Sequence, residues 1–320
     1  MQISALYPEQ PREIGAIDPF AEVVSTTSLS RLWMGQSFVI DSHSTLAALG
    51  RTPWAVPVGI GTALAVLRSP YDAAMQARSV AIATGNNVSI AYGSADPAFV
   101  SSVRGRPFSK PATYMSTYVR IVRDLLSGVH VRDDLEGEIV GGVLPPAEHP
   151  RVEIGIGVLR EGMARVGAPS AEFQVSWLAP KNYIRDVLNP ASTRSDGTHP
   201  RTVAYVQCAV DRPGRSGTLL AHTGAGKHLE THHYTEMLRR AGLDVDASDP
   251  ASGARELMEK RVFVFDTADR IAEELLSYSE CGVDEVIVNV TGVSLLYGAS
   301  AAIEDLADIV AAADRVTPGS

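Results

Sequence analysis

Asp41 and His43 are the residues whose types and spacing most directly offer proton chemistry. They stand in the run Asp41-Ser42-His43, which closes a β-rich stretch predicted as a strand, Arg31–Ile40. An imidazole at a strand end can hydrogen-bond a cofactor ring or shuttle a proton near neutral pH. The alternative is a structural histidine that only hydrogen-bonds its surroundings. We interpret Asp41 and His43 as candidate catalytic residues.

Two Gly-x-Gly pairs, Gly59-Ile60-Gly61 and Gly155-Ile156-Gly157, lie on predicted strands. A dinucleotide-binding fingerprint requires a third glycine three residues later, where this chain has Leu64 and Arg160. Neither pair is therefore a dinucleotide fingerprint. The pairs predict either close approach of a ligand to the strand backbone or plain packing inside the fold.

The second glycine pair is followed by groups suited to a phosphate. A helix is predicted to begin near Glu161, so the backbone after Gly157 offers free N–H groups, and Arg160 adds positive charge. The next strand-to-helix loop, Trp177-Leu178-Ala179-Pro180-Lys181, brings a lysine to the same rim. The alternative for Lys181 is a solvated surface lysine.

Four histidines, His222, His228, His232 and His233, gather in one segment. His228 and His232 have the spacing of zinc ligands on one helix face, but no cysteine is near and the adjacent carboxylates form no obvious third ligand. We therefore expect no metal, and expect one of the histidines to line an active-site mouth. The overlapping run Thr223-Gly224-Ala225-Gly226-Lys227-His228 is not a P-loop, because its first glycine and its Ser/Thr are missing.

Short β-rich runs alternate with helical patterns along the whole chain, which is typical of βα units around a parallel sheet. Eight such units predict one (β/α)8 TIM barrel over residues 1–320, and an open doubly wound sheet is the alternative. The predicted strands are Gln2–Leu6, Arg31–Ile40, Ala55–Leu64, Val88–Tyr92, Val152–Val158, Phe173–Leu178, Val203–Val210 and Glu285–Val290. The predicted helices are Ile14–Ser25, Ser44–Leu49, Tyr71–Thr84, Pro111–Leu126, Glu161–Val166, Thr267–Tyr278 and Ser300–Ala313.

Two stretches break this alternation. Gly128–Pro150 and the Gly- and His-rich segment Asp211–Glu230 are predicted as long loops. Loops of that length in a compact domain are often lids or binding loops. The alternative is a mobile surface connection.

Composition narrows the class of protein. The chain has 320 residues, 45% of them hydrophobic, and a formal net charge of −9. An acidic balance argues against a general nucleic-acid binder. Two cysteines, Cys208 and Cys281, are too few for a disulfide framework. With no signal-peptide pattern and no apolar run of roughly 20 residues, we expect a cytoplasmic protein without a membrane partner.

Several ordered motifs resemble the bacterial luciferase-like superfamily. They are Val58-Gly59-Ile60-Gly61-Thr62-Ala63-Leu64, Leu67-Arg68-Ser69-Pro70-Tyr71, the alanine-rich run 73–78, Ile40-Asp41-Ser42-His43, Glu153-Ile154-Gly155-Ile156-Gly157, and Cys281-Gly282-Val283-Asp284-Glu285-Val286. The resemblance covers residues 31–313. It implies a β/α barrel, usually a homodimer, that uses coenzyme F420 or FMN.

The resemblance also assigns residues. It implies ring contacts from His43, Thr62, Ala63, Tyr92 and Gly93, and phosphate contacts from Gly157, Val158 and Lys181. It implies a non-prolyl cis peptide at Ala63–Leu64, so Leu64 joins the cofactor-binding set with Arg160 and Trp177. Asp96 is a loose match to an acid that serves proton transfer in relatives. The tryptophan that deazaflavin dehydrogenases carry after the strand-two histidine is missing, which argues against sugar-phosphate oxidation.

Three functions follow as hypotheses. The first is an F420-dependent reductase that transfers a hydride to an activated double bond, with a small molecule or a dehydroamino acid in a modified peptide as substrate. The second is an FMN-dependent monooxygenase of a small organic molecule. The third is a luciferase-like subunit that binds without catalysis.

Overall fold

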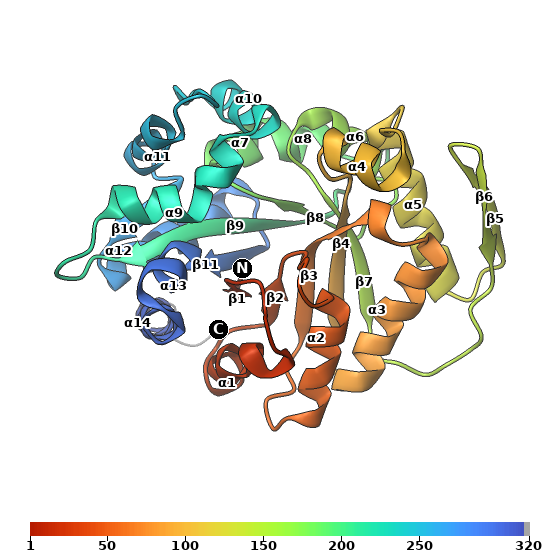
Figure 1. Ribbon diagram of the computed structural model, residues 1–320, viewed down its shortest axis with the longest axis horizontal. Helices are drawn as coiled ribbons and strands as arrows, with labels where there is room; N and C mark the ends of the chain where they lie inside the picture. Colours follow the sequence, from red (N-terminus) through yellow and green to blue (C-terminus); the bar gives the residue numbers. More distant parts are fainter. Residues whose placement is uncertain (317–320) are drawn as a thin grey trace.

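The computed structural model describes residues 1–316, and residues 317–320 of the predicted domain lie outside the described residues. Eight parallel strands close into a barrel surrounded by helices, which confirms the predicted TIM barrel (Figure 1). Pairing of β8 with β9 closes the ring and excludes the open sheet. In ring order the strands are β1 (Gln2–Tyr7), β2 (Leu32–Met34), β3 (Val58–Leu64), β4 (Val88–Gly93), β7 (Val152–Gly157), β8 (Phe173–Ser176), β9 (Arg201–Val210) and β11 (Glu285–Asn289).

A ninth strand was not predicted. β10 (Phe263–Asp266) pairs with the last residues of β9, from Gln207 to Val210. It lies on the same edge of β9 as β8, because β11 occupies the other edge at Gln207. β8 therefore pairs with the beginning of β9 and β10 with its end, so β8 and β9 separate at the carboxyl end of the barrel.

Helices and short helical turns surround the strands, and most predicted helices are confirmed to within a few residues. They are η1 (Ile14–Ile17), α1 (Asp18–Thr26), α2 (Ser42–Ala48), η2 (Leu49–Arg51), η3 (Ala65–Leu67), α3 (Pro70–Thr84), α4 (Pro97–Arg104), α5 (Pro111–Leu126), α6 (Glu161–Gly167), α7 (Lys181–Tyr183), η4 (Ile184–Leu188), α8 (Asn189–Ala191), α9 (Gly217–Leu229), α10 (His232–Arg240), α11 (Pro250–Glu259), α12 (Ala268–Ser277), η5 (Tyr278–Cys281), α13 (Thr291–Tyr297) and α14 (Ala299–Val316).

Local sequence explains where α3 begins and ends. The Ser69 hydroxyl accepts a hydrogen bond from the Asp72 N–H, Pro70 occupies the first turn, and Gly85 ends the helix in the left-handed conformation. The alanines on one face, among them Ala73 and Ala77, are fully buried, which lets α3 pack closely against the sheet and α5.

The amino-terminal end of the barrel is filled by a charged network. Glu285 is fully buried and accepts hydrogen bonds from Ser4 (2.6 Å), Trp33 (2.7 Å) and Arg201 (2.8 Å). Arg201 also donates to Glu153 over 2.9 Å. Every carboxylate here has a cationic partner, so these charges are paired within the protein, and the opposite end remains for chemistry.

Three predicted segments need correction. Strand β2 ends at Met34, and the carboxylate of Asp41 caps α2 through the Ser44 N–H, so His43 lies in a helix and does not close a strand. The predicted loop Gly128–Pro150 contains a two-stranded hairpin, β5 (Val131–Leu135) and β6 (Glu138–Gly142), which stands at the right edge of Figure 1. The two residues at its turn both have positive φ, which is the geometry of a tight hairpin.

The predicted loop Asp211–Glu230 is largely helix α9. Its glycines pack closely: a Cβ at Gly217 would lie 2.5 Å from Met258, and one at Gly224 would lie 3.3 Å from the Gly292 nitrogen. Tertiary packing therefore overrides the low helix propensity of glycine. None of the helices within residues 1–316 has the length and apolar character to cross a membrane.

Candidate active site

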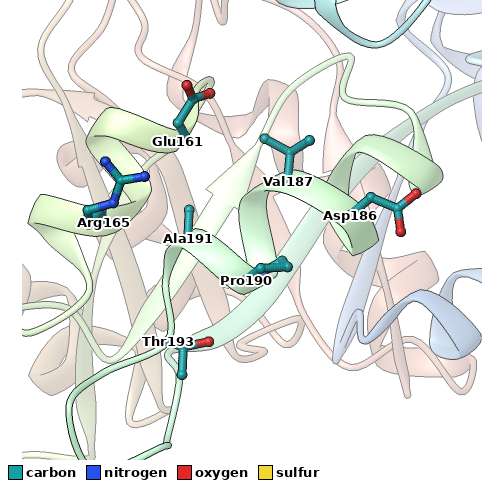
Figure 2. Close-up of a pocket in the computed structure, with 7 residues that line it drawn as sticks. All are labelled: Glu161, Arg165, Asp186, Val187, Pro190, Ala191 and Thr193. Carbon is teal, nitrogen blue, oxygen red and sulfur yellow. The ribbon is translucent and has the colours of Figure 1, made fainter.

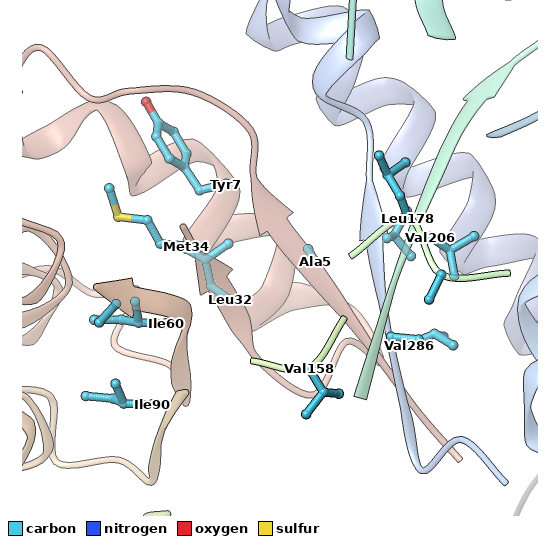
Figure 3. Packing of buried hydrophobic residues seen from close by; sticks show 14 of the residues in the cluster. Ala5, Tyr7, Leu32, Met34, Ile60, Ile90, Val158, Leu178, Val206 and Val286 are labelled. Carbon is cyan, nitrogen blue, oxygen red and sulfur yellow. The ribbon is translucent and has the colours of Figure 1, made fainter. Parts of the chain in front are cut away.

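The predicted strand-end residues divide between the two faces of the barrel wall. Thr62, Leu64 and Trp177 are partly exposed, and Trp177 packs against the cluster that fills the barrel interior. Ala63, Tyr92 and Val158 are instead buried in the core between strands and helices, where Figure 3 shows Val158. The Tyr92 hydroxyl donates to the Ala73 carbonyl of α3, over 3.3 Å. Ring contact by Ala63 and Tyr92 is therefore not supported, because both side chains point away from the barrel interior.

Thr62 forms one wall of the carboxyl end together with two of the predicted glycines. A Cβ at Gly93 would lie 2.6 Å from Thr62 Oγ1, and a Cβ at Gly157 would lie 2.7 Å from Thr62 Cγ2. Thr62 therefore occupies the space that side chains on β4 and β7 would fill. We call these three residues the threonine-glycine wall.

The remaining glycines of the two pairs serve packing. A Cβ at Gly59 would lie 2.4 Å from the Trp33 ring, and one at Gly155 would lie 2.6 Å from the Phe173 ring. Of the two interpretations of these pairs, interior packing is correct at Gly59 and Gly155. The cis peptide implied by the resemblance is also misplaced: the bond in question is Gly61–Thr62 and not Ala63–Leu64.

A second wall, formed at the ends of β8, β9 and β11, carries polar side chains with unused hydrogen-bonding atoms. Trp177 Nε1, Gln207 Oε1 on β9 and Asn289 Nδ2 at the end of β11 are buried and have no hydrogen-bond partner. Buried polar atoms are normally paired, so this group of free atoms at the strand ends offers hydrogen-bond partners to a polar ligand. We call Trp177, Gln207 and Asn289 the polar wall, and the space at the carboxyl end between the two walls the barrel mouth.

A row of rings leads from the polar wall outward. Trp177 lies 4.8 Å from Tyr205 and 5.0 Å from His228, and His228 lies 4.9 Å from Tyr234, measured between ring centroids. Burial, with a smaller effect from His233, lowers the pKa of His228 to about 4, so its imidazole is neutral at pH 7. Its Nδ1 has no hydrogen-bond partner. Of the four clustered histidines, His228 therefore packs against the polar wall through Trp177, and its role at an active-site mouth stays a prediction.

Helix α10 bridges the loops that follow β4 and β7. His233 lies 3.9 Å from the Asp96 carboxylate, which also caps α4 through the Ala98 N–H. Arg160 donates to Glu236 over 2.6 Å, and Figure 1 shows α10 at the same end of the molecule as α4 and α6. Asp96 and Arg160 therefore both contact α10, but the charge of Arg160 is neutralised by the carboxylate of Glu236.

Lys181 does not join Arg160. Its ammonium donates to Glu274 over 2.7 Å and to Ser277 over 2.9 Å, both on α12. The predicted phosphate grip of two adjacent cations is therefore not formed in this structure. The Val158 N–H donates to the Val175 carbonyl over 2.9 Å, so it is not free for a phosphate, and the N–H groups at the start of α6 remain the candidate phosphate contacts.

His43 and Asp41 form a separate cluster beside the end of β3. His43 is 3% exposed, neither ring nitrogen has a hydrogen-bond partner, and Nδ1 lies 3.7 Å from the Asp41 carboxylate. Burial lowers the pKa of His43, so this imidazole is also neutral. Burial would raise the pKa of Asp41, but nearby His43, the Ser44 N–H and Arg68 hold it well below its usual range. Asp41 is thus an ionised partner of Arg68 and no general acid.

Two surface grooves lie outside the barrel mouth. One, of about 480 Å³, runs between α6 and the helical run from η4 to α8, and Figure 2 shows Glu161, Arg165 and Asp186 on its sides. The other, of about 270 Å³, lies between η3, α5 and the hairpin. Neither contains the orphaned polar atoms of the mouth, so neither is the candidate active site.

The sequence prediction missed Tyr205, Gln207 and Asn289. The pattern that identifies them is the alternation along β9 and β11: Arg201, Val203, Tyr205 and Gln207 share one face, as do Glu285, Ile287 and Asn289. Within residues 1–316 there is no group of three or more His, Cys, Asp or Glu side chains that could hold a metal ion.

Comparisons with known proteins agree with this architecture. A family model described as luciferase-like monooxygenase matches residues 4–285. An F420-dependent secondary alcohol dehydrogenase solved with an F420-acetone adduct is 15% identical, covers 98% of both chains and has a TM-score of 0.74. A coenzyme F420 dependent tetrahydromethanopterin reductase from Methanopyrus kandleri is 15% identical over 96% of both chains, with a TM-score of 0.70.

A third similar structure holds FMN. It is the oxygenating constituent of 3,6-diketocamphane monooxygenase from the CAM plasmid of Pseudomonas putida, 12% identical over 97% of both chains, with a TM-score of 0.66. At these identities the similarity shows the fold alone. No curated protein sequence matches the chain significantly.

Proposed function

The chain belongs to the luciferase-like monooxygenase family of F420- or FMN-dependent enzymes, and from this premise we propose that it is an F420-dependent reductase. The proposed reaction transfers a hydride to one carbon of an activated double bond, and water or a side chain gives the proton that the other carbon takes up. The observation that carries the proposal is the barrel mouth, where a wall without large side chains faces a wall of buried, unpartnered polar atoms. A flat cofactor ring fits against the wall without large side chains, and a polar substrate fits against the wall of unpartnered atoms.

The chain's own residues would bind and orient the ring. On the threonine-glycine wall, Thr62 lies over Gly93 and Gly157, so this wall presents one small side chain to a flat ligand. The N–H groups at the start of α6 would hold a phosphate. When bound, reduced F420 supplies the hydride, and the protein supplies orientation and protection from water.

The polar wall would hold the substrate. His228 is neutral at pH 7, so its imidazole carries one N–H and one lone pair, and its buried Nδ1 has no hydrogen-bond partner. It would hydrogen-bond the substrate carbonyl or amine and would not deliver a stored proton. Bridging of the β4 and β7 loops by α10 would exclude water while the hydride moves.

F420 is favoured over FMN by two neighbours that use F420, at TM-scores of 0.74 and 0.70. Titration of the purified protein with F420 and with FMN tests this choice. We expect F420 to bind at least about tenfold more tightly, a difference of about 1.4 kcal/mol. Equal or tighter binding of FMN would overturn it.

A finer proposal concerns the substrate, which we infer to be a dehydroamino acid in a peptide-derived natural product. Incubation with reduced F420 and a dehydroalanine peptide should add two hydrogens to the peptide mass. An unchanged mass while F420 is bound would refute this substrate.

The resemblance also supports a homodimer, which light scattering of the purified protein measures.

The second candidate function is an FMN-dependent monooxygenase, which the family description and the FMN-containing neighbour favour. It predicts consumption of dioxygen when FMN and a flavin reductase are supplied. Deazaflavins react poorly with dioxygen, so an oxygen electrode separates the two functions. If neither cofactor binds, the chain acts as a non-catalytic subunit.

A further inference from the structure

Gln207 and Asn289 stand side by side on the polar wall. They are register neighbours of the parallel strands β9 and β11, and they are 2% and 1% exposed. Along the same strands Tyr205 and Ile287 belong to the cluster that fills the barrel interior. Because side chains alternate along a strand, Gln207 and Asn289 share this inward face one layer closer to the carboxyl end.

Backbone partners fix the orientation of both amides. The Thr291 N–H donates to Asn289 Oδ1 over 2.9 Å, and Gln207 Nε2 donates to the Gly224 carbonyl over 3.4 Å. A backbone N–H can only donate and a carbonyl can only accept, so neither amide can be flipped without losing its bond. The atoms left over are a donor, Asn289 Nδ2, and an acceptor, Gln207 Oε1, and both are buried and unpartnered.

This pair selects the chemistry of a ligand. A free donor beside a free acceptor is satisfied by a group that presents an acceptor and a donor side by side. A carboxylate offers only acceptors and would meet Gln207 Oε1 with repulsion, and an ammonium offers only donors. The edge of a cis amide, with its N–H and C=O on the same side, meets both atoms at once.

We propose that Gln207 and Asn289 form a substrate subsite that binds the N–H and C=O edge of a cyclic amide, such as a lactam or a diketopiperazine. The inference rests on the proposed function, because it places the cofactor ring on the threonine-glycine wall of β3, β4 and β7. In the ring of strands, β9 lies across the barrel from β3, and β11 lies across from β4. The substrate therefore meets the ring from the polar wall.

The neighbouring glycines allow two helices to pack closely beside Gln207 and Asn289. A Cβ at Gly292 would lie 2.4 Å from the Leu220 carbonyl, and one at Gly224 would lie 3.5 Å from Gln207 Oε1. The absence of side chains at these positions brings α9 and α13 close together beside the two amides. Gly224 thereby places its carbonyl where it orients Gln207.

The test compares two probes on the full-length protein. They are 2,5-piperazinedione, which has two cis amides, and its N,N′-dimethyl derivative, which keeps the carbonyls but lacks the N–H groups. Titrations are followed by the side-chain amide signals of a ¹⁵N-labelled sample. We expect saturable shifts of the Asn289 and Gln207 signals with the first probe, and at least about tenfold weaker binding of the second.

Asn289→Asp is the matched variant, because it retains the oxygen that accepts from Thr291 and replaces the free donor with an acceptor. We expect at least about tenfold weaker binding of 2,5-piperazinedione and an F420 dissociation constant within about threefold of the parent protein. Asn182→Asp, on the exposed surface of α7, is the control and should change neither value. If Asn289→Asp does not fold, the two-probe comparison on the parent protein decides.

Three results overturn the proposal. They are equal binding of both probes, absence of shifts at Asn289 and Gln207, and loss of F420 or FMN affinity in Asn289→Asp. The last would assign the pair to the imide edge of the cofactor ring. If 2,5-piperazinedione binds as expected while neither cofactor binds, the proposed reductase function fails and the amide subsite stands.

Discussion

The Tyr205 hydroxyl donates a hydrogen bond to the backbone carbonyl of Gly61 across the interior of the barrel, over 2.7 Å. The two residues belong to β9 and β3, which are four strands apart in the ring of eight. Burial, with the charge of Glu285, raises the pKa of Tyr205 well above its usual value, so the hydroxyl stays protonated and donates. The bond joins the strand that carries Thr62 to the strand that carries Gln207, and so fixes the distance between the two walls of the mouth.

Tyr205→Phe removes this bond and leaves the ring in place. We expect the free energy of unfolding to fall by about 1 kcal/mol, the usual net value of a buried hydrogen bond. Cofactor affinity should fall as well, because the walls are no longer held together. Urea unfolding and F420 titration measure the two effects. Tyr71→Phe, whose exposed hydroxyl donates to Val143 over 3.3 Å, is the control, and an equal loss in both variants would contradict the prediction.

The fit of Thr62 against Gly157 predicts a rescue. Gly157→Ala places a Cβ 2.7 Å from Thr62 Cγ2, and we expect a loss of about 1–3 kcal/mol in unfolding free energy from the resulting overlap. Thr62→Ser removes that methyl group, so the double variant should recover most of the loss. Gly162→Ala is the control, since no atom lies within 4 Å of its Cβ. Additive losses in the double variant would show that the two residues do not compete for this space.

Much of the barrel is predictable from the sequence because strands such as β4 and β7 are short runs rich in β-forming residues and bounded by turn residues. The end of strand β2 could not be predicted in this way. The β-forming residues of Gly35–Ile40 extend the predicted strand, but in the structure this segment leads into the Asp41 cap of α2. Helix α9 could not be predicted either. Its glycines allow close contact with β10 and α13, which are distant in sequence.

The candidate site is predictable only in part, because it depends on which face of a strand a residue occupies. The register of β3 against β4 shifts between Gly61 and Ala63, so regular alternation fails there and Ala63 points into the helix layer. Lys181 has the right place in the loop order, but Glu274 lies near enough to bind it. Such an ion-pair partner is determined by how the outer helices pack, and no local sequence pattern reveals it.

Lys181→Met separates a structural role from a phosphate-binding role. Its ammonium is partly exposed and pairs with Glu274 of α12, so we expect a stability loss of about 1 kcal/mol or less and unchanged F420 affinity. Thermal unfolding and F420 titration are the measurements. A tenfold loss of affinity with unchanged stability would restore Lys181 to the phosphate site.

His228 gives stability a pH dependence. Its pKa is about 4 in the folded chain and about 6.5 when unfolded, so below pH 6.5 the unfolded chain binds more protons and the folded state loses stability as pH falls. The loss reaches at most about 3 kcal/mol and is complete below pH 4. His228→Gln should flatten the decline of unfolding free energy between pH 6.5 and 5, whereas His130→Gln, at an exposed position, should leave it unchanged. An unaltered slope in His228→Gln would show that His228 does not contribute to it.

The pair of Arg160 and Glu236 should control access to the mouth, because it ties α10 to the loop after β7. Glu236→Gln weakens this ion pair and frees the charge of Arg160. Because F420 is anionic, we expect it to associate at least about threefold faster with this variant. Screening in 1 M salt should abolish the difference in rate. Stopped-flow fluorescence of F420 measures the rate. Global stability should change little, since both side chains are partly exposed. Glu273→Gln, which breaks the exposed pair with Arg270 on α12, is the matched control. Equal association rates in the two variants would mean that α10 does not gate the barrel mouth.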